Sequence, residues 1–91
     1  MAQVTIRVEV WSAGELALLP RAELTTALRK LRDRPDAGKP LERLLQGCRS
    51  LRVGDCRIVY LHIAERDEVQ VIAIGRRRDE EVYATARGRT G

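Results

Sequence analysis

Three stretches of the chain carry apolar residues in the pattern of β-strands. Residues 4–10 alternate between apolar and polar side chains, which is typical of a strand with one buried face. Residues 57–63 and 69–74 are almost continuously apolar, as expected of strands in the interior of a sheet. Residues 65–68 are polar and connect these two strands. We therefore expect one half-buried strand and two central ones.

A fourth strand precedes the central pair. From Arg49 onward the period of the apolar residues is again two, as far as the dipeptide Gly54-Asp55. Glycine at the first central position of a two-residue loop fits a type II′ hairpin. This pattern predicts an antiparallel pair of strands, in which Ser50 and Arg52 share one face.

Two helical segments lie between the first strand and the hairpin. A helix that begins at Pro20 and ends before Pro35 is predicted by the i, i+3, i+4, i+7 spacing of Leu24, Ala27, Leu28 and Leu31. Ser12 and Glu15 have the spacing of a capping box, which predicts a shorter helix over residues 13–19.

The C-terminal segment predicts a last, short helix. Asp79 is a suitable N-cap for a helix over residues 80–87, and the acidic Glu80 and Glu81 complement the dipole of its first turn. We expect residues 88–91 to fray.

The elements follow one another in the order β-α-α-β-β-β-α. Residues 36–40 are expected to form a loop, and residues 41–45 either a helical turn or an extended entry into the sheet. Ninety-one residues suffice for one domain, which we expect to span residues 1–91. The predicted fold class is α+β: a small antiparallel sheet with the two N-terminal helices on one face and a short C-terminal helix.

Arginine dominates the charge of the chain. Fifteen arginines and two lysines give a net charge of +4, a bias that a GC-rich genome also produces. Six of the arginines lie near predicted strand ends: Arg49, Arg52, Arg57, Arg76, Arg77 and Arg78. A basic face of this kind attracts nucleic acid or an acidic protein without specifying which.

The two cysteines and the single histidine do not form a metal site. Cys48 and Cys56 are eight residues apart, and no CxxC spacing is present. A disulfide across the hairpin is possible, but we expect reduced, buried thiols. The N-terminus alternates instead of forming an apolar block, so we expect neither signal peptide nor membrane span and a cytoplasmic location. We expect no cofactor.

Two segments resemble motifs of the RelE/ParE toxin superfamily of bacterial toxin–antitoxin modules. Residues 51–60, Leu-Arg-Val-Gly-Asp-Cys-Arg-Ile-Val-Tyr, are similar to the hairpin of that family. Residues 74–83, Ile-Gly-Arg-Arg-Arg-Asp-Glu-Glu-Val-Tyr, are similar to its C-terminal motif. The resemblance covers essentially the whole chain, although the helical half matches only in pattern.

The resemblance to RelE-like members implies a ribosome-associated endoribonuclease. Such enzymes cut mRNA in the A site through attack of a ribose 2′-OH on the neighbouring phosphate. By position, Arg57 would bind the phosphate, Arg77 would stabilise or protonate the leaving group, and Tyr83 would stack or transfer a proton. Further RNA-binding side chains are expected from Arg49, Arg52, Arg76 and Arg78.

One departure from the family pattern bears on activity. RelE-like enzymes often have lysines on the strand before the hairpin, where this chain has Cys48 and Ser50. Arginine is almost never deprotonated in proteins, so it replaces a lysine base poorly. We therefore expect slow cleavage of naked RNA. The alternatives are a ParE-like inhibitor of DNA gyrase without enzymatic activity, and a degenerate homologue that acts only with its antitoxin.

Structural roles compete with these functional ones. Arg57 is also placed to pair with Glu80 or Glu81, and Tyr83 to pack on the sheet. Residues 76–78 also fit a solvated strand end. By strand parity, Tyr60 belongs to the core and His62 to the face opposite Arg57.

The resemblance also implies partners. The first is a cognate antitoxin whose acidic segment wraps the arginine-rich face. The second is mRNA on the ribosome. A larger toxin–antitoxin complex that binds operator DNA through the antitoxin is a further expectation.

Overall fold

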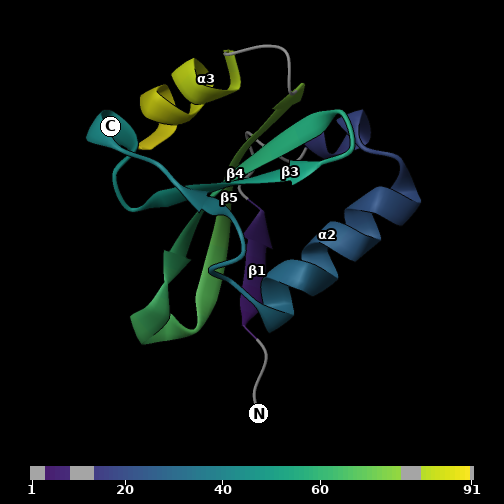
Figure 1. Cartoon of the computed structure of the whole chain (residues 1–91), viewed down its shortest axis with the longest axis horizontal. Helices are drawn as coiled ribbons and strands as arrows, with labels where there is room; N and C mark the ends of the chain where they lie inside the picture. The colour runs from purple at the N-terminus through teal and green to yellow at the C-terminus, as the bar shows by residue number, and fades with distance from the viewer. Residues whose placement is uncertain (1–3, 9–13, 77–80, 91) are drawn as a thin grey trace.

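The structure is a computed structural model that describes residues 4–8, 14–76 and 81–90. A five-stranded sheet of order β1-β5-β4-β3-β2 forms its centre (Figure 1). The strands and α-helices are β1 (Thr5–Val8), α2 (Arg21–Asp33), β2 (Lys39–Pro40), β3 (Cys48–Val53), β4 (Cys56–Ile63), β5 (Glu68–Arg76) and α3 (Glu81–Thr90). Three 3₁₀ turns complete the order: η1 (Gly14–Leu18), η2 (Arg43–Leu45) and η3 (Ala64–Arg66).

The sheet is mixed, so the expectation of an antiparallel sheet was wrong at the β1 edge. The expected order was also incomplete, because the expected loop over residues 36–40 contains the edge strand β2, which pairs with β3. Strand β1 pairs with β5 in parallel, with Thr5 opposite Glu68 and Val8 opposite Val71. The chain leaves β1 through η1 and α2 and re-enters the sheet at the far edge, at β2. Strand β1 therefore lies beside the last strand and points in the same direction.

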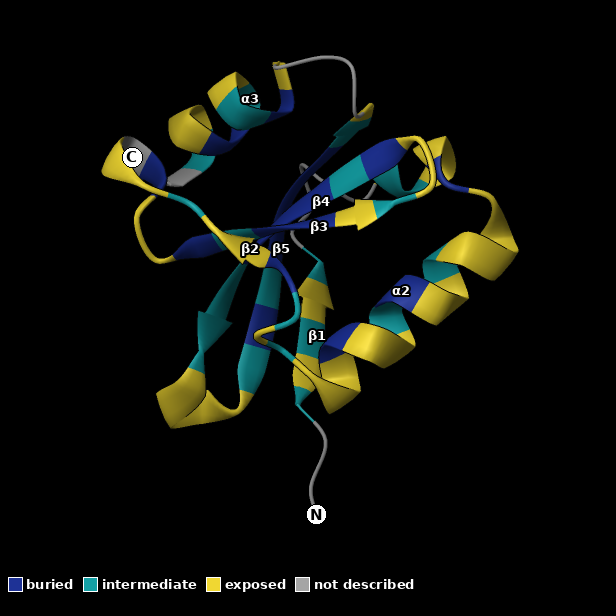
Figure 2. Cartoon of the chain, viewed as in Figure 1, coloured by how far each residue is buried: buried dark blue, intermediate teal, exposed yellow. Residues whose placement is uncertain are grey.

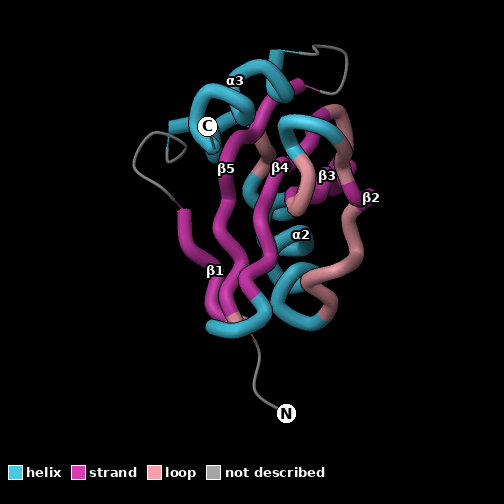
Figure 3. The backbone as a smooth tube through the Cα atoms, turned by 90° about the vertical axis from the view of Figure 1, so that its left-hand side faces the viewer, coloured by secondary structure: helices cyan, strands magenta, loops and turns pink. Residues whose placement is uncertain are grey.

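The helices cover opposite faces of the sheet. Helix α2 packs on one face, which we call the α2 face, and α3 packs on the other, the α3 face (Figures 1 and 3). Helix α3 contacts β5 and β4 and the turn η2. The fold therefore has an α-helix on each side of the sheet.

The predicted central helix is confirmed. Helix α2 starts after Pro20, and its stripe buries Ala27 and Leu31, with Leu24 and Leu28 half-buried. The predicted first helix is instead the 3₁₀ turn η1. Its predicted cap, Ser12, lies outside the described residues. The carboxylate of Glu15 accepts a hydrogen bond from the distant backbone N–H of Ile74 at 3.1 Å.

The predicted hairpin is confirmed. Gly54 has φ +55° and Asp55 is not in the left-handed region, as a type II′ turn requires.

The predicted end of the last helix is wrong, because helix α3 continues through residues 88–90, which we expected to fray. Its last turn is held because Arg89 binds Glu15 and the carbonyl of Ile72.

Each face of the sheet has its own apolar core (Figure 2). The core of the α2 face includes Tyr60 and Leu31, both fully buried, and the core of the α3 face includes Val59 and Ala86. The two cysteines are free and belong to different cores, Cys48 to the α3 face and Cys56 to the α2 face. A disulfide across the hairpin is therefore excluded.

Candidate anion-binding site on the α3 face

A row of three residues crosses the sheet under the start of α3. In the antiparallel ladders, Arg52 of β3 lies opposite Arg57 of β4, and Arg57 lies opposite Gly75 of β5. Residues directly opposite each other in antiparallel strands lie on the same face of the sheet, as do residues two apart along one strand. Val59, which is two residues from Arg57 on β4, belongs to the α3-face core. Arg52 and Arg57 therefore extend from the α3 face.

The two arginines form a like-charged cross-strand pair. Their Cβ atoms are about 5 Å apart in such a pairing, and like charges directly opposite destabilise a sheet. Arg52 is exposed and Arg57 is half-buried, and neither forms an ion pair within the described part of the chain. Both guanidinium groups are thus available to one anion, which would relieve their repulsion.

Gly75 lets α3 approach the sheet closely at this row. A Cβ placed on Gly75 would lie 2.7 Å from the Cβ of Val82, a distance that real side chains do not adopt. Val82 is itself buried on the α3 face. Any residue larger than glycine at position 75 would therefore push the first turn of α3 away from the arginine pair.

The phenol of Tyr83 contacts β3 beside the arginine pair. Its oxygen lies 3.3 Å from the hydroxyl oxygen of Ser50, and either group can donate the hydrogen bond. Ser50 is 4% exposed and is two residues from Arg52 on the same strand and face. Two residues of strand span about 6.6 Å, so Tyr83 and the Arg52–Arg57 pair border one site.

Two other predicted RNA-binding residues lie elsewhere. The guanidinium of Arg49 donates hydrogen bonds to the carbonyls of Asp36 and Gly38, at 3.1 and 2.8 Å, on the α2 side of β3. Arg76 pairs in register with Cys56, a residue of the α2-face core, and lines a small cavity with Glu15 and Glu81. The structure does not bring either arginine to the Arg52–Arg57 pair.

Several predicted residues lie outside the described residues. They are Arg77 and Arg78, together with Asp79 and Glu80, which we predicted as cap and ion-pair partner. Glu81, the other predicted partner of Arg57, lies within the described residues and forms no ion pair with it there.

The remaining phenol and the imidazole belong to the α2 face. Tyr60 is fully buried, and its oxygen accepts a hydrogen bond of 2.8 Å from the backbone N–H of Gly38. Burial raises the pKa of the Tyr60 phenol above its usual value. His62 lies opposite Val69, on the same face as Tyr60. As expected, neither group reaches the site on the α3 face.

The two-residue period of the strands places Ser50 on the same face of the sheet as Arg57, and it places Arg49 on the opposite face. What the sequence did not show is the contact between Ser50 and Tyr83, which joins residues 33 positions apart. Its only signal was that Ser50 is a polar residue that shares a strand face with Arg52. Among the described residues, no group of His, Cys, Asp or Glu side chains is arranged to hold a metal ion.

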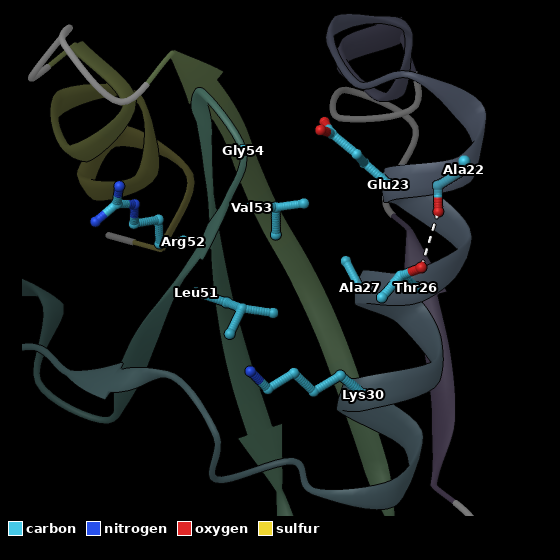
Figure 4. A pocket seen from close by; sticks show the side chains of 9 residues that line it. All are labelled: Ala22, Glu23, Thr26, Ala27, Lys30, Leu51, Arg52, Val53 and Gly54. Carbon is cyan, nitrogen blue, oxygen red and sulfur yellow. Dashed lines mark hydrogen bonds between the residues drawn. The ribbon is translucent and has the colours of Figure 1, made fainter.

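A separate cleft of about 370 Å³ lies between α2 and the β3–β4 hairpin. Figure 4 shows Leu51 and Val53 pointing into it from β3 and Lys30 reaching across it from α2. Arg52 also lines this cleft, but its guanidinium lies on the side of the ribbon toward α3. This cleft is therefore on the face opposite Tyr83 and does not belong to the arginine site.

No helix in the described ranges is long and apolar enough to span a membrane.

Comparisons with known proteins identify the family. Residues 10–81 match the profile of a family described as the ParE toxin of the type II toxin–antitoxin system parDE. A chain of the RelBE2 toxin–antitoxin complex from Mycobacterium tuberculosis is 30% identical, with a TM-score of 0.70 over 87% of this chain and 97% of that one. None of the curated proteins matches the sequence significantly.

Two structures of E. coli RelE extend the similarity. A doubly substituted RelE in the free state is 25% identical, with a TM-score of 0.74 over 98% of both chains. The same variant in complex with a peptide of the antitoxin RelB is 28% identical, with a TM-score of 0.66 over 94% of this chain and 95% of that one. The chain therefore belongs to the ParE toxin family of type II toxin–antitoxin systems, within the RelE/ParE superfamily.

Proposed function

We propose that this toxin is a ribosome-dependent endoribonuclease of the RelE type. The observation that supports this proposal is the contact between Tyr83 and Ser50, which holds a phenol beside the Arg52–Arg57 pair on one face of the sheet. A phosphate bound by these two arginines would have a phenolic hydroxyl within reach. Cation pairs and a hydroxyl are groups that phosphodiester cleavage can use.

In the proposed reaction, the ribose 2′-oxygen attacks the adjacent phosphorus and the 5′-oxygen leaves. Arg57, which is half-buried, would bind the non-bridging oxygens and stabilise the charge of the transition state. Arg52 would bind the same or the next phosphate. Arg77 remains our candidate for the leaving group, and Tyr83 for stacking on a base or proton transfer.

The site has no evident strong base among the described residues. Cys48 is buried in the α3-face core, and burial raises the pKa of its thiol, so it is a poor source of a thiolate. Ser50 is also buried, and its hydroxyl is bound to Tyr83. We infer that catalysis depends on positioning and charge, and that the ribosome supplies alignment of the mRNA.

We also propose a cognate antitoxin as the partner. The similar E. coli RelE structure is a complex with an antitoxin peptide. On this chain, acidic residues of an antitoxin segment would pair with Arg52 and Arg57 and so compete with RNA. An assembly of both proteins would bind operator DNA through the antitoxin.

A ParE-like inhibitor of DNA gyrase is the second candidate. The matching family profile carries the ParE description, and the lysines that RelE-like enzymes often have are replaced by Cys48 and Ser50. An inhibitor of this kind would use the arginine face for binding and would perform no chemistry.

The experiment is to add the purified toxin to a reconstituted translation reaction and map the 5′ ends of the mRNA. We expect cuts at fixed codon positions that fall about 100-fold in Arg57→Ala and at least about 10-fold in Tyr83→Phe. Arg66→Gln is the matched control, because it removes an exposed arginine from η3, at the opposite end of β4. Intact mRNA together with inhibited supercoiling in a parallel gyrase assay would reject the nuclease and support the second candidate.

A further inference from the structure

A bidentate ion pair joins α3, near the C-terminus of the chain, to η1, near its N-terminus, at the edge of the sheet. Arg89 of α3 donates to both carboxylate oxygens of Glu15 in η1, at 2.8 and 3.2 Å. The side chains are only 19% and 26% exposed. A partly buried, bidentate pair of this geometry is stronger and more directional than a surface ion pair.

The same pair completes the hydrogen bonding of β5. Strand β1 pairs with β5 only as far as Val71, so the edge of β5 has no strand partner in the described residues beyond that point. The guanidinium of Arg89 donates to the carbonyl of Ile72 at 2.9 Å, and the carboxylate of Glu15 accepts from the N–H of Ile74 at 3.1 Å. The ion pair thus binds the backbone groups that another strand would otherwise bind.

Helix α3 has a small apolar interface. It has ten residues, contains Gly88, and buries Val82 and Ala86. Isolated helices of this length are marginal in water, and glycine inside a helix weakens it further. The position of α3 therefore depends on its contacts with the sheet.

Two contacts fix α3 along β5. Val82 lies on Gly75, and Arg89 binds Ile72. Seven residues of helix span about 10.5 Å and three residues of strand span about 10 Å, so both contacts fit together when α3 runs antiparallel to β5. A helix held at both ends cannot rotate or slide, and Tyr83 follows the first contact directly.

We propose that Glu15 and Arg89 are positioning residues that hold the phenol of Tyr83 at the Arg52–Arg57 pair. Among the described residues, Glu15 and Arg89 bind each other and the backbone of β5, and both act through α3. The proposal deepens the nuclease proposal and rests on it for the catalytic consequence. Its structural part, that the ion pair determines where Tyr83 lies, is measurable without RNA.

The test compares Arg89→Gln, Glu15→Gln and the double variant Glu15→Gln/Arg89→Gln. Arg7→Gln is the matched control, because Arg7 forms an ion pair of 3.2 Å with Glu68 that joins β1 to β5 away from α3. The readouts are hydrogen exchange of residues 81–90, the rate of Tyr83 nitration by tetranitromethane, and kcat and KM in the translation reaction. Tyr60 is fully buried and contributes little to nitration.

We expect both single variants to exchange α3 amides at least about 10-fold faster, to nitrate Tyr83 several-fold faster and to lose about 10-fold in kcat with little change in KM. The double variant should lose no more than the larger of the two single losses, since either substitution alone already removes the ion pair. Arg7→Gln should match the unsubstituted protein.

Unchanged nitration and α3 exchange in both single variants would overturn the proposal, as would losses equal to those of Arg7→Gln. Losses in the double variant equal to the product of the two single losses, with its fold intact by circular dichroism, would also overturn it. If the unsubstituted toxin cuts no mRNA, the nuclease proposal fails instead, and exchange and nitration still decide whether the ion pair positions Tyr83.

Discussion

The two faces of the sheet are stabilised in different ways. The α2 face is covered by a helix of 13 residues and contains large, fully buried side chains such as Tyr60 and Leu31. The α3 face is covered by a helix of ten residues that buries one valine and one alanine. On that face the ion pair of Arg89 and the hydrogen bond of Tyr83 supplement the apolar contacts.

This difference shows how a small protein can separate stability from function. Apolar burial contributes about 25 cal/mol per Å² and dominates folding, so the α2 face should determine global stability. Polar contacts contribute less but are directional. They are suited to placing a side chain with a proposed catalytic role, such as Tyr83, and substitutions on the α3 face should therefore change activity more than stability.

The largest effect on stability is expected from a substitution in the core of the α2 face. Leu31→Ala should lower the free energy of unfolding by about 3 kcal/mol, because it opens a cavity in a fully buried site. Val82→Ala on the α3 face should cost about 1.5 kcal/mol, for the two methyl groups it removes. Urea denaturation followed by circular dichroism measures both. Equal losses would show that the two faces do not differ in this way.

The next prediction compares alanine substitutions of two glycines, Gly75 in β5 and Gly88 in α3. Gly75→Ala should displace α3 because its Cβ would meet Val82, and we expect a cost of about 1–3 kcal/mol and at least about a 10-fold loss of mRNA cleavage. Gly88→Ala is the matched control, since nothing lies within 4 Å of its Cβ and alanine favours a helix by about 0.5–1 kcal/mol. Full activity in Gly75→Ala would contradict close packing of α3 at the arginine row.

A smaller effect is expected at the hydroxyl that holds Tyr83. Ser50→Ala should reduce stability by only about 1 kcal/mol and reduce kcat several-fold, because the phenol loses its partner. Thr26→Ala removes a hydroxyl that bonds within α2, to the carbonyl of Ala22, and should leave kcat unchanged. A stability loss in Ser50→Ala without any change in kcat would assign Ser50 a structural role alone.

The smallest effect concerns pH and the α2 face. The pKa of Tyr60 is higher in the folded state because of burial, so its contribution to stability is complete below the unfolded pKa of about 10. That contribution is lost as pH rises from this value through the folded pKa. We expect Tyr60→Phe to flatten the decline above about pH 10 relative to the unsubstituted protein. The free energy of unfolding measured from about pH 8 to about pH 11 tests this, and identical slopes in Tyr60→Phe and the unsubstituted protein would contradict it.

Local patterns predicted the elements whose causes lie in neighbouring residues. The stripe of α2 and the turn at Gly54 are set within a few positions, so the sequence located both. The parallel pairing of β1 with β5 depends on where the chain returns after α2, which no local pattern encodes. The continuation of α3 to Thr90 depends on Glu15, 74 residues before Arg89.

The candidate site was predictable to a similar extent. Strand parity placed Arg52 and Arg57 on one face, and it would have placed Arg49 on the other. The role of Gly75 was not visible, because it depends on the approach of Val82 from another element. The proposed role of Arg77 remains a prediction that lies outside the described residues.

The most direct test of one shared site is a double-mutant cycle between Arg57 and Tyr83, measured as the rate of mRNA cleavage in the reconstituted translation reaction. Residues that act on one phosphate as a unit are not additive. We predict that Arg57→Ala/Tyr83→Phe is no slower than the slower of its two single variants by more than a few-fold. Losses that multiply, so that the double variant shows the product of the two single effects, would contradict a common site.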